Sequence, residues 1–149
     1  MAFKFRYDGL LEYREKLLER EQYELAKIAQ EASSIEKECL RLEMERFKWS
    51  EIFSAKQSEG ISPEECRLFS ENLEALERRL LAEQAKLRDV MKRLEQQREK
   101  LIEMKKKVEM LKALKEQEEE RYRKEETKLA QKASDEMVVL NWGKDSNDV

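Results

Sequence analysis

Two heptad stripes of mostly apolar residues, one on each side of a Gly-Ile-Ser-Pro segment, constrain this chain more than any other feature. The steps within each stripe alternate between three and four residues without a skip. An average spacing of 3.5 residues keeps one face of a helix toward a partner helix, which is typical of a coiled coil. The first stripe consists of Tyr7, Leu11, Arg14, Leu18, Glu21, Leu25, Ile28, Ala32, Ile35, Cys39, Leu42, Arg46, Trp49 and Phe53. The second consists of Phe69, Leu73, Leu76, Leu80, Glu83, Leu87, Val90, Leu94, Gln97, Leu101, Met104, Val108 and Leu111, followed by the polar positions Lys115 and Glu118.

The segment between the stripes carries the signals that end one helix and start another. Gly60 can adopt the left-handed conformation that closes a helix, and Ser62 is a good N-cap for the next one. Pro63 suits the first helical position, and Glu65 completes a capping box. We therefore expect a first helix over about residues 8–58, a turn over 59–62, a second helix over 63–135 and a flexible tail over 136–149.

A turn this short makes the two helices antiparallel neighbours. With the turn centred near residue 60, position x of the first helix should face roughly position 119 − x of the second, and the second stripe turns polar near the point where its partner begins. The sequence therefore predicts an all-α fold with a single domain: a long antiparallel two-helix coiled-coil hairpin with a short mid-chain turn.

Composition supports helices and argues against most other classes of protein. Of 149 residues, 44% are charged, whereas only three are Gly and one is Pro, which leaves little material for turns. Sustained apolar heptads disfavour a disordered chain, because disordered chains have no stripe to bury. The net charge of −3 marks no polyanion or membrane partner. The basic stretch 86–107 is interspersed with glutamates and lacks aromatic stacking partners, so we expect no nucleic-acid binding.

The sequence offers no recognisable catalytic, metal or cofactor site. It has no histidine, no Gly-rich phosphate loop, no paired-cysteine zinc spacing and no nucleophile elbow. We expect a protein that is not an enzyme and that takes no cofactor, metal or nucleotide. Cys39 and Cys66 would lie about 20 Å apart along a hairpin, too far for a disulfide, and are expected to be packing residues in a reducing compartment.

No stretch approaches the roughly 20 apolar residues that span a bilayer, and the N-terminus lacks the apolar core of a secretory signal. We therefore expect a cytoplasmic location.

The residues of the two heptad stripes together form the seam between the helices. Three apolar residues of the first helix fall outside this seam. Leu40, Met44 and Phe47 recur at helical spacing on the outer face of the first helix, where the hairpin alone would leave them in water. We call them the outer strip. Two interpretations remain open: scattered surface apolar residues or a contact with a third helix, or a docking strip for a partner helix or the lining of a ring.

Both ends of the chain and its midpoint resemble the FliJ family, general chaperone or stalk proteins of the bacterial flagellar type III export apparatus. The opening Phe3-Lys-Phe-Arg-Tyr-Asp-Gly-Leu-Leu-Glu-Tyr-Arg14 is similar to the family's pair of aromatics followed by a double Leu and an Arg. Phe69, Leu73 and Leu76 after the turn fit the family's midpoint. Gln131-Lys132-Ala-Ser-Asp135-Glu136 is similar to its closing motif. Trp142 and the acidic tail do not match the family pattern.

The resemblance implies a fold similar to the central stalk of rotary ATPases. It implies that the protein binds the centre of the hexameric flagellar export ATPase, promotes its assembly and activity, links it to the export gate membrane protein and handles export chaperones. A peripheral association with the membrane at the flagellar base follows. The residues expected to bind the ATPase ring are Phe3, Phe5, Leu10, Leu11, Arg14, Gln131, Lys132, Asp135 and Glu136. The outer strip would bind the gate or a chaperone. A general coiled-coil holdase or scaffold, and the equivalent stalk of an injectisome, remain alternatives.

Overall fold

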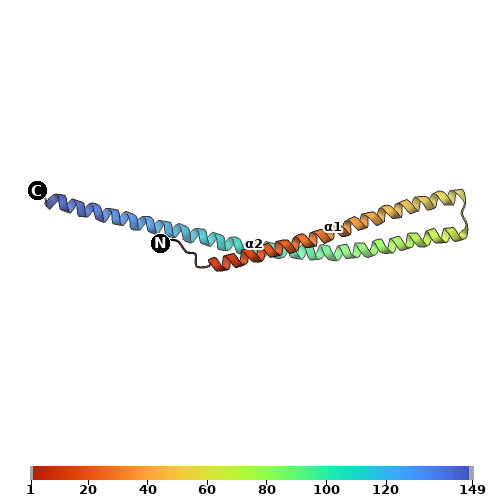
Figure 1. Ribbon diagram of the computed structural model, residues 1–149, viewed down its shortest axis with the longest axis horizontal. Helices are drawn as coiled ribbons and strands as arrows, with labels where there is room; N and C mark the ends of the chain where they lie inside the picture. Colours follow the sequence, from red (N-terminus) through yellow and green to blue (C-terminus); the bar gives the residue numbers. More distant parts are fainter. Residues whose placement is uncertain (1, 148–149) are drawn as a thin grey trace. The chain divides into compact units, whose positions relative to one another are not determined.

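The computed structural model describes residues 2–147, with side chains described for residues 2–144. It contains two α-helices, α1 (Asp8–Glu59) and α2 (Pro63–Asn147), which run antiparallel on either side of a turn at residues 60–62 (Figure 1). No strand occurs among these residues. The predicted all-α helical hairpin with a short turn is therefore confirmed.

The turn forms through the local interactions that its sequence predicts. Gly60 has a φ of 93°, in the left-handed region that favours glycine. Ser62 caps α2: its hydroxyl accepts a hydrogen bond from the Glu65 amide at 3.2 Å, and its carbonyl accepts one from the Cys66 amide at 3.0 Å. Pro63 is the first residue of α2, where its missing N–H costs nothing.

The contacts divide the chain into two units, and each helix contributes to both. We call Glu19–Ile102 the turn unit and Met1–Leu18 with Glu103–Val149 the terminal unit. In the turn unit the core is a cluster of Cys39, Leu42, Leu76 and Leu80, with Ile35 and Trp49 packed against it. Near the turn, the Trp49 and Phe53 rings both contact Phe69, at centroid distances of 6.3 and 5.2 Å.

The seam residues of both stripes are buried or half-buried, with two exceptions. Arg46 is exposed, and Tyr7 is 37% exposed. The contacts between Glu21 and Gln97 and between Trp49 and Phe69 fall within one residue of the predicted pairing. The heptad pattern therefore identifies the packed face of both helices.

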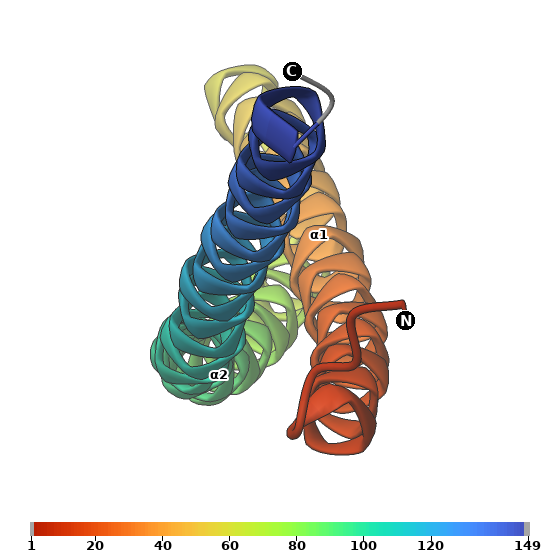
Figure 2. The ribbon, with the colours of Figure 1, turned by 90° about the vertical axis from the view of Figure 1, so that its left-hand side faces the viewer.

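In the terminal unit an extended N-terminal segment continues the packing beyond the first turn of α1. It precedes the helix as an extended stretch (Figures 1 and 2), and its Phe3 ring contacts Tyr122 of α2 at a centroid distance of 5.6 Å. Phe5 is only 6% exposed and forms a core cluster with Leu11 and Val108. Phe5, which belongs to neither heptad stripe, is therefore part of the packed core, because the N-terminal segment contacts α2 before α1 begins.

The predicted end of the second helix is also wrong. Instead of stopping near Asp135 and giving way to a flexible tail, α2 is helical through Asn147; residues 148–149 lie outside the described part of the chain. No Gly or Pro occurs between Pro63 and Gly143, so the backbone meets no breaker. Beyond the end of its packing partner, the side chains of α2 are exposed, but the backbone hydrogen bonds within the helix remain.

Candidate partner-binding surfaces

The far end of α2 is an uncovered helix within the terminal unit. All side chains from residue 123 to residue 144 are exposed, whereas Tyr122 is half-buried. This segment holds a concentration of large apolar side chains that α1 does not cover, with exposed fractions between 58% and 78%: Leu129, Met137, Val138, Val139, Leu140 and Trp142. Exposed apolar side chains gathered in this way are typical of surfaces that bind a partner.

The closing motif lies on this uncovered segment. Lys132, Asp135 and Glu136 line a shallow hollow of about 520 Å³ together with Val139 and Leu140. Gln131 is exposed on the same stretch of helix. The structure therefore brings the charged residues of the motif together on one helix face beside apolar side chains.

The residues of the opening motif have different surroundings from one another. Phe5 and Leu11 are buried in the core of the terminal unit, at 6% exposure each, so the expectation that they face a partner is corrected. Phe3 and Arg14 are half-buried, and Leu10 is 41% exposed. The opening and closing motifs do not meet: Phe3 contacts Tyr122, and Lys132 lies ten residues further along α2, or about 15 Å at 1.5 Å per residue.

The outer strip is exposed in the turn unit. Leu40, Met44 and Phe47 are 58%, 66% and 66% exposed. Phe47 borders a groove of about 530 Å³ that also involves Leu73 and Glu77 of α2. Leu40 and Met44 do not border this groove, so the strip and the groove share only the Phe47 ring.

Charged residues flank the seam of the turn unit in an ordered way that the apolar heptads alone did not reveal. On α1 a Glu recurs every seventh residue at Glu24, Glu31, Glu38 and Glu45. On α2 a basic residue recurs every seventh residue at Arg79, Lys86, Arg93 and Lys100. Arg93 pairs with Glu31 at 2.6 Å and Arg79 approaches Glu38 at 3.9 Å, so the two flanks face each other. Reading the sequence at intervals of seven for charge would have found them.

One polar layer interrupts the seam beside these flanks. The Gln97 side-chain amide donates to a Glu21 carboxylate oxygen at 2.6 Å and to the Glu21 backbone carbonyl at 3.1 Å. Lys100 lies 3.4 Å from the same carboxylate. The hydrogen bond from Gln97, aided by Lys100, holds the pKa of Glu21 below its ordinary value.

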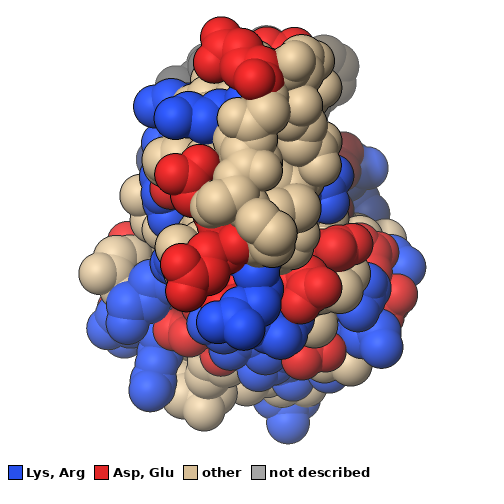
Figure 3. All heavy atoms as spheres, turned by 90° about the vertical axis from the view of Figure 1, so that its right-hand side faces the viewer, with Lys and Arg blue, Asp and Glu red and all other residues tan. Residues whose placement is uncertain are grey.

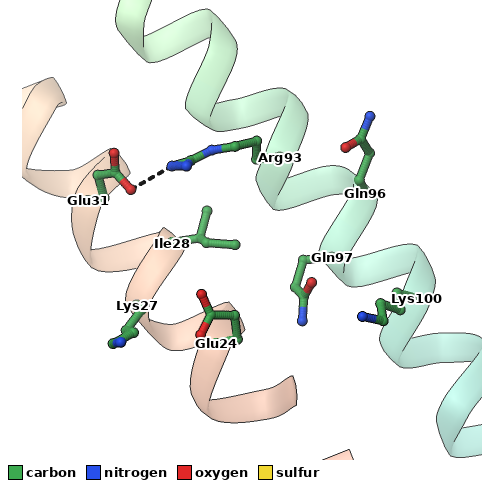
Figure 4. A pocket seen from close by; sticks show the side chains of 8 residues that line it. All are labelled: Glu24, Lys27, Ile28, Glu31, Arg93, Gln96, Gln97 and Lys100. Carbon is green, nitrogen blue, oxygen red and sulfur yellow. Dashed lines mark hydrogen bonds and ion pairs between the residues drawn. The ribbon is translucent and has the colours of Figure 1, made fainter. Parts of the chain in front are cut away.

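The groove at this layer is lined mainly by charged and amide side chains. Its volume is about 520 Å³, and the ion pair between Arg93 and Glu31 spans it (Figure 4). Its lining residues are Glu24, Lys27, Ile28, Glu31, Arg93, Gln96, Gln97 and Lys100. Three of its charged side chains pair the helices: Arg93 of α2 with Glu31 of α1, and Lys100 of α2 with Glu21 of α1.

Further features bear on the kind of surface this protein offers. Among the described residues no group of acidic, Cys or His side chains is placed to hold a metal ion, and no helix is long and apolar enough to cross a membrane. Cys39 and Cys66 are free thiols.

Seen from the turn, Lys and Arg side chains alternate with Asp and Glu side chains (Figure 3), so this end presents no field of a single sign.

Comparison with known proteins gives one match. A family model described as Flagellar FliJ protein matches residues 3–147. Neither a search of curated proteins nor a search of solved structures found a match.

Proposed function

This chain belongs to the flagellar FliJ family, and from that membership we propose that it is a non-enzymatic stalk and adaptor of the flagellar export apparatus. Its ring-binding end is the uncovered segment of α2. There it binds the centre of the hexameric export ATPase, promotes assembly of the ring and stimulates ATP hydrolysis. Its partners also include the export gate and export chaperones, and it acts in the cytoplasm at the membrane of the flagellar base.

The observation that carries the proposal is the exposure of the closing motif on a helix without a packing partner. Lys132, Asp135 and Glu136 are exposed and clustered around one hollow. None of them forms an ion pair within the described part of the chain, so their charges are available to another protein. Phe3, Leu10 and Arg14 contribute a second, less exposed group on the same unit, and Phe5 and Leu11 support it from the core.

The test removes two charges from the motif and compares the effect with a matched removal elsewhere. Asp135→Ala with Glu136→Ala should change the free energy of unfolding by no more than about 0.5 kcal/mol, as exposed substitutions usually do. The same variant should lose most of the stimulation of ATP hydrolysis by the export ATPase. The control is Asp89→Ala with Glu99→Ala, which removes two exposed carboxylates from α2 in the turn unit and should leave stimulation intact.

The outer strip is proposed to serve a second partner. Replacement of Leu40, Met44 and Phe47 by Ser should spare stimulation of the ATPase and weaken binding to the export gate or to an export chaperone. If the Asp135 and Glu136 variant stimulates the ATPase normally, the ring-binding assignment of this end is wrong. Suppression of aggregation of many unrelated proteins, with no effect on the ATPase, would instead identify a general holdase.

A further inference from the structure

The heptad positions of α2 continue beyond the last residue that the N-terminal segment covers. From Val108 the alternating steps lead through Tyr122 to the four positions Leu129, Lys132, Glu136 and Val139. Up to Tyr122 these positions are buried or half-buried, whereas all four beyond Glu125 are exposed. The seam therefore extends along α2 for several turns after its partner within the chain has ended.

The chemistry of these four positions is self-complementary in the reversed direction. In order they are apolar, basic, acidic and apolar. When two copies are placed antiparallel about the midpoint near Ser134, Leu129 faces Val139 of the second copy and Lys132 faces Glu136 of the second copy. Both contacts occur twice by symmetry. A parallel arrangement would instead place Lys132 against Lys132 and Glu136 against Glu136, which costs energy.

Several residues that flank this face fit the same arrangement, whereas Asp135, one residue from the midpoint, lies near Asp135 of the second copy and opposes it. Ala133 lies close to the symmetry axis, where a small side chain allows two helices to approach. Lys128 and Trp142 lie on one flank, six residues before and eight residues after the midpoint, so the indole, 78% exposed in the single chain, can reach the Lys128 stem of the second copy. The hollow beside Val139 and Leu140 supplies apolar surface for the contact.

We propose that the uncovered segment of α2, residues 125–142, binds a second copy of this chain as an antiparallel helix pair. Two helices of about five turns bury less than the roughly 1,600 Å² of a standard stable interface, so the association is weak and reversible. It does not rest on the proposed function. It uses the face that carries Lys132 and Glu136, and therefore a second copy and an ATPase ring would exclude each other there.

The test combines charge-reversal variants with sedimentation equilibrium of the full chain. The measured quantity is the dissociation constant of the pair, over loading concentrations from about 1 µM to about 1 mM. Lys132→Glu alone and Glu136→Lys alone each turn two attractive contacts into two repulsive ones and should weaken association about tenfold or more. The two single variants mixed together, and the variant that carries both changes, restore opposite charges and should recover the association of the unchanged chain. The control Lys124→Glu reverses an exposed charge on the outer side of α2, one residue before this segment, and should have little effect.

Several outcomes would overturn the proposal. A chain that stays monomeric up to about 1 mM does not form the pair. If neither single charge reversal weakens association, the chains associate through another surface. If the mixture of the two single variants does not recover association, the contact between Lys132 and Glu136 is excluded. Circular dichroism on each variant keeps these results separate from a loss of folding, because all the altered residues are exposed in the single chain.

Discussion

Two leucines that lie two residues apart on α1 provide a stringent test of the helix packing. Leu42 is fully buried, at 0% exposure, against Cys39, Leu76 and Leu80, whereas Leu40 is 58% exposed on the outer strip. Leu→Ala removes the same three carbons from the same helix in both cases. The small gain in helix propensity is also the same, so the difference between the two variants isolates the effect of burial.

The expected magnitudes follow from the burial of each side chain. Removal of three buried carbons at about 0.8 kcal/mol each should lower the free energy of unfolding of Leu42→Ala by roughly 2.4 kcal/mol, and the residual cavity adds to this loss. In a two-helix layer the neighbouring side chains can close over the hole, so we expect about 2–3.5 kcal/mol, in the lower part of the usual range of about 2–5 kcal/mol. For Leu40→Ala, with 58% of the side chain already in water, the same reasoning gives about 1 kcal/mol or less.

Urea denaturation followed by circular dichroism measures both variants against the unchanged chain. Leu42→Ala should lower the midpoint with little change in the dependence on urea concentration, since nearly the same surface is exposed on unfolding. Equal destabilisation by the two variants, or a larger effect at Leu40, would refute the assignment of the packed face.

Three further predictions concern the polar layer, the glycines and the thiols. The pKa of Glu21 is lowered from its ordinary 4.5, so the ionised carboxylate stabilises the fold at neutral pH, and this contribution is lost as the pH falls below about 4.5. The melting temperature of Glu21→Gln should therefore fall less on acidification than that of the unchanged chain. Gly60→Ala should destabilise the protein by about 1 kcal/mol, because the alanine would be strained at a left-handed φ of 93°. Gly9→Ala should stabilise the protein by up to about 1 kcal/mol, because Gly9 lies in a helix with open space around it. Thermal melting measures both effects. A thiol reagent should modify the half-buried Cys66 well before Cys39, whose burial also raises its thiol pKa; equal rates in native protein would contradict this.

The sequence predicts the hairpin well because its main signals are local or periodic. The cap at Ser62 and the left-handed Gly60 depend on neighbours within a few residues, and the burial of Leu42 follows from heptad spacing. The burial of Phe5 could not be predicted in this way, because an extended segment has no helical period and its partner on α2, Val108, lies about a hundred residues away.

The end of α2 differs from the sequence-based prediction for a different physical reason. The heptad pattern reports where a helix is covered, and its change to polar residues does not mark where the helix stops. In an uncovered stretch such as Lys128–Glu136 the helix persists, since its backbone bonds are internal and its composition favours helix. The candidate partner surface lies in this stretch, which the closing motif identifies although the packing pattern does not.

The three-residue turn and the aromatic contacts beside it also determine the order in which the protein can fold. Trp49 and Phe69 are twenty residues apart in the chain, so the loop that joins them closes at a small entropic cost once the turn forms. Phe3 and Tyr122 close a loop of more than a hundred residues, at a cost that only prior pairing of the intervening helices can reduce. We therefore expect the helices to zip from the turn outward, and the N-terminal segment to dock last. During synthesis that segment is made before α1 and waits, with Phe5 in water, until the part of α2 that carries Val108 has been made.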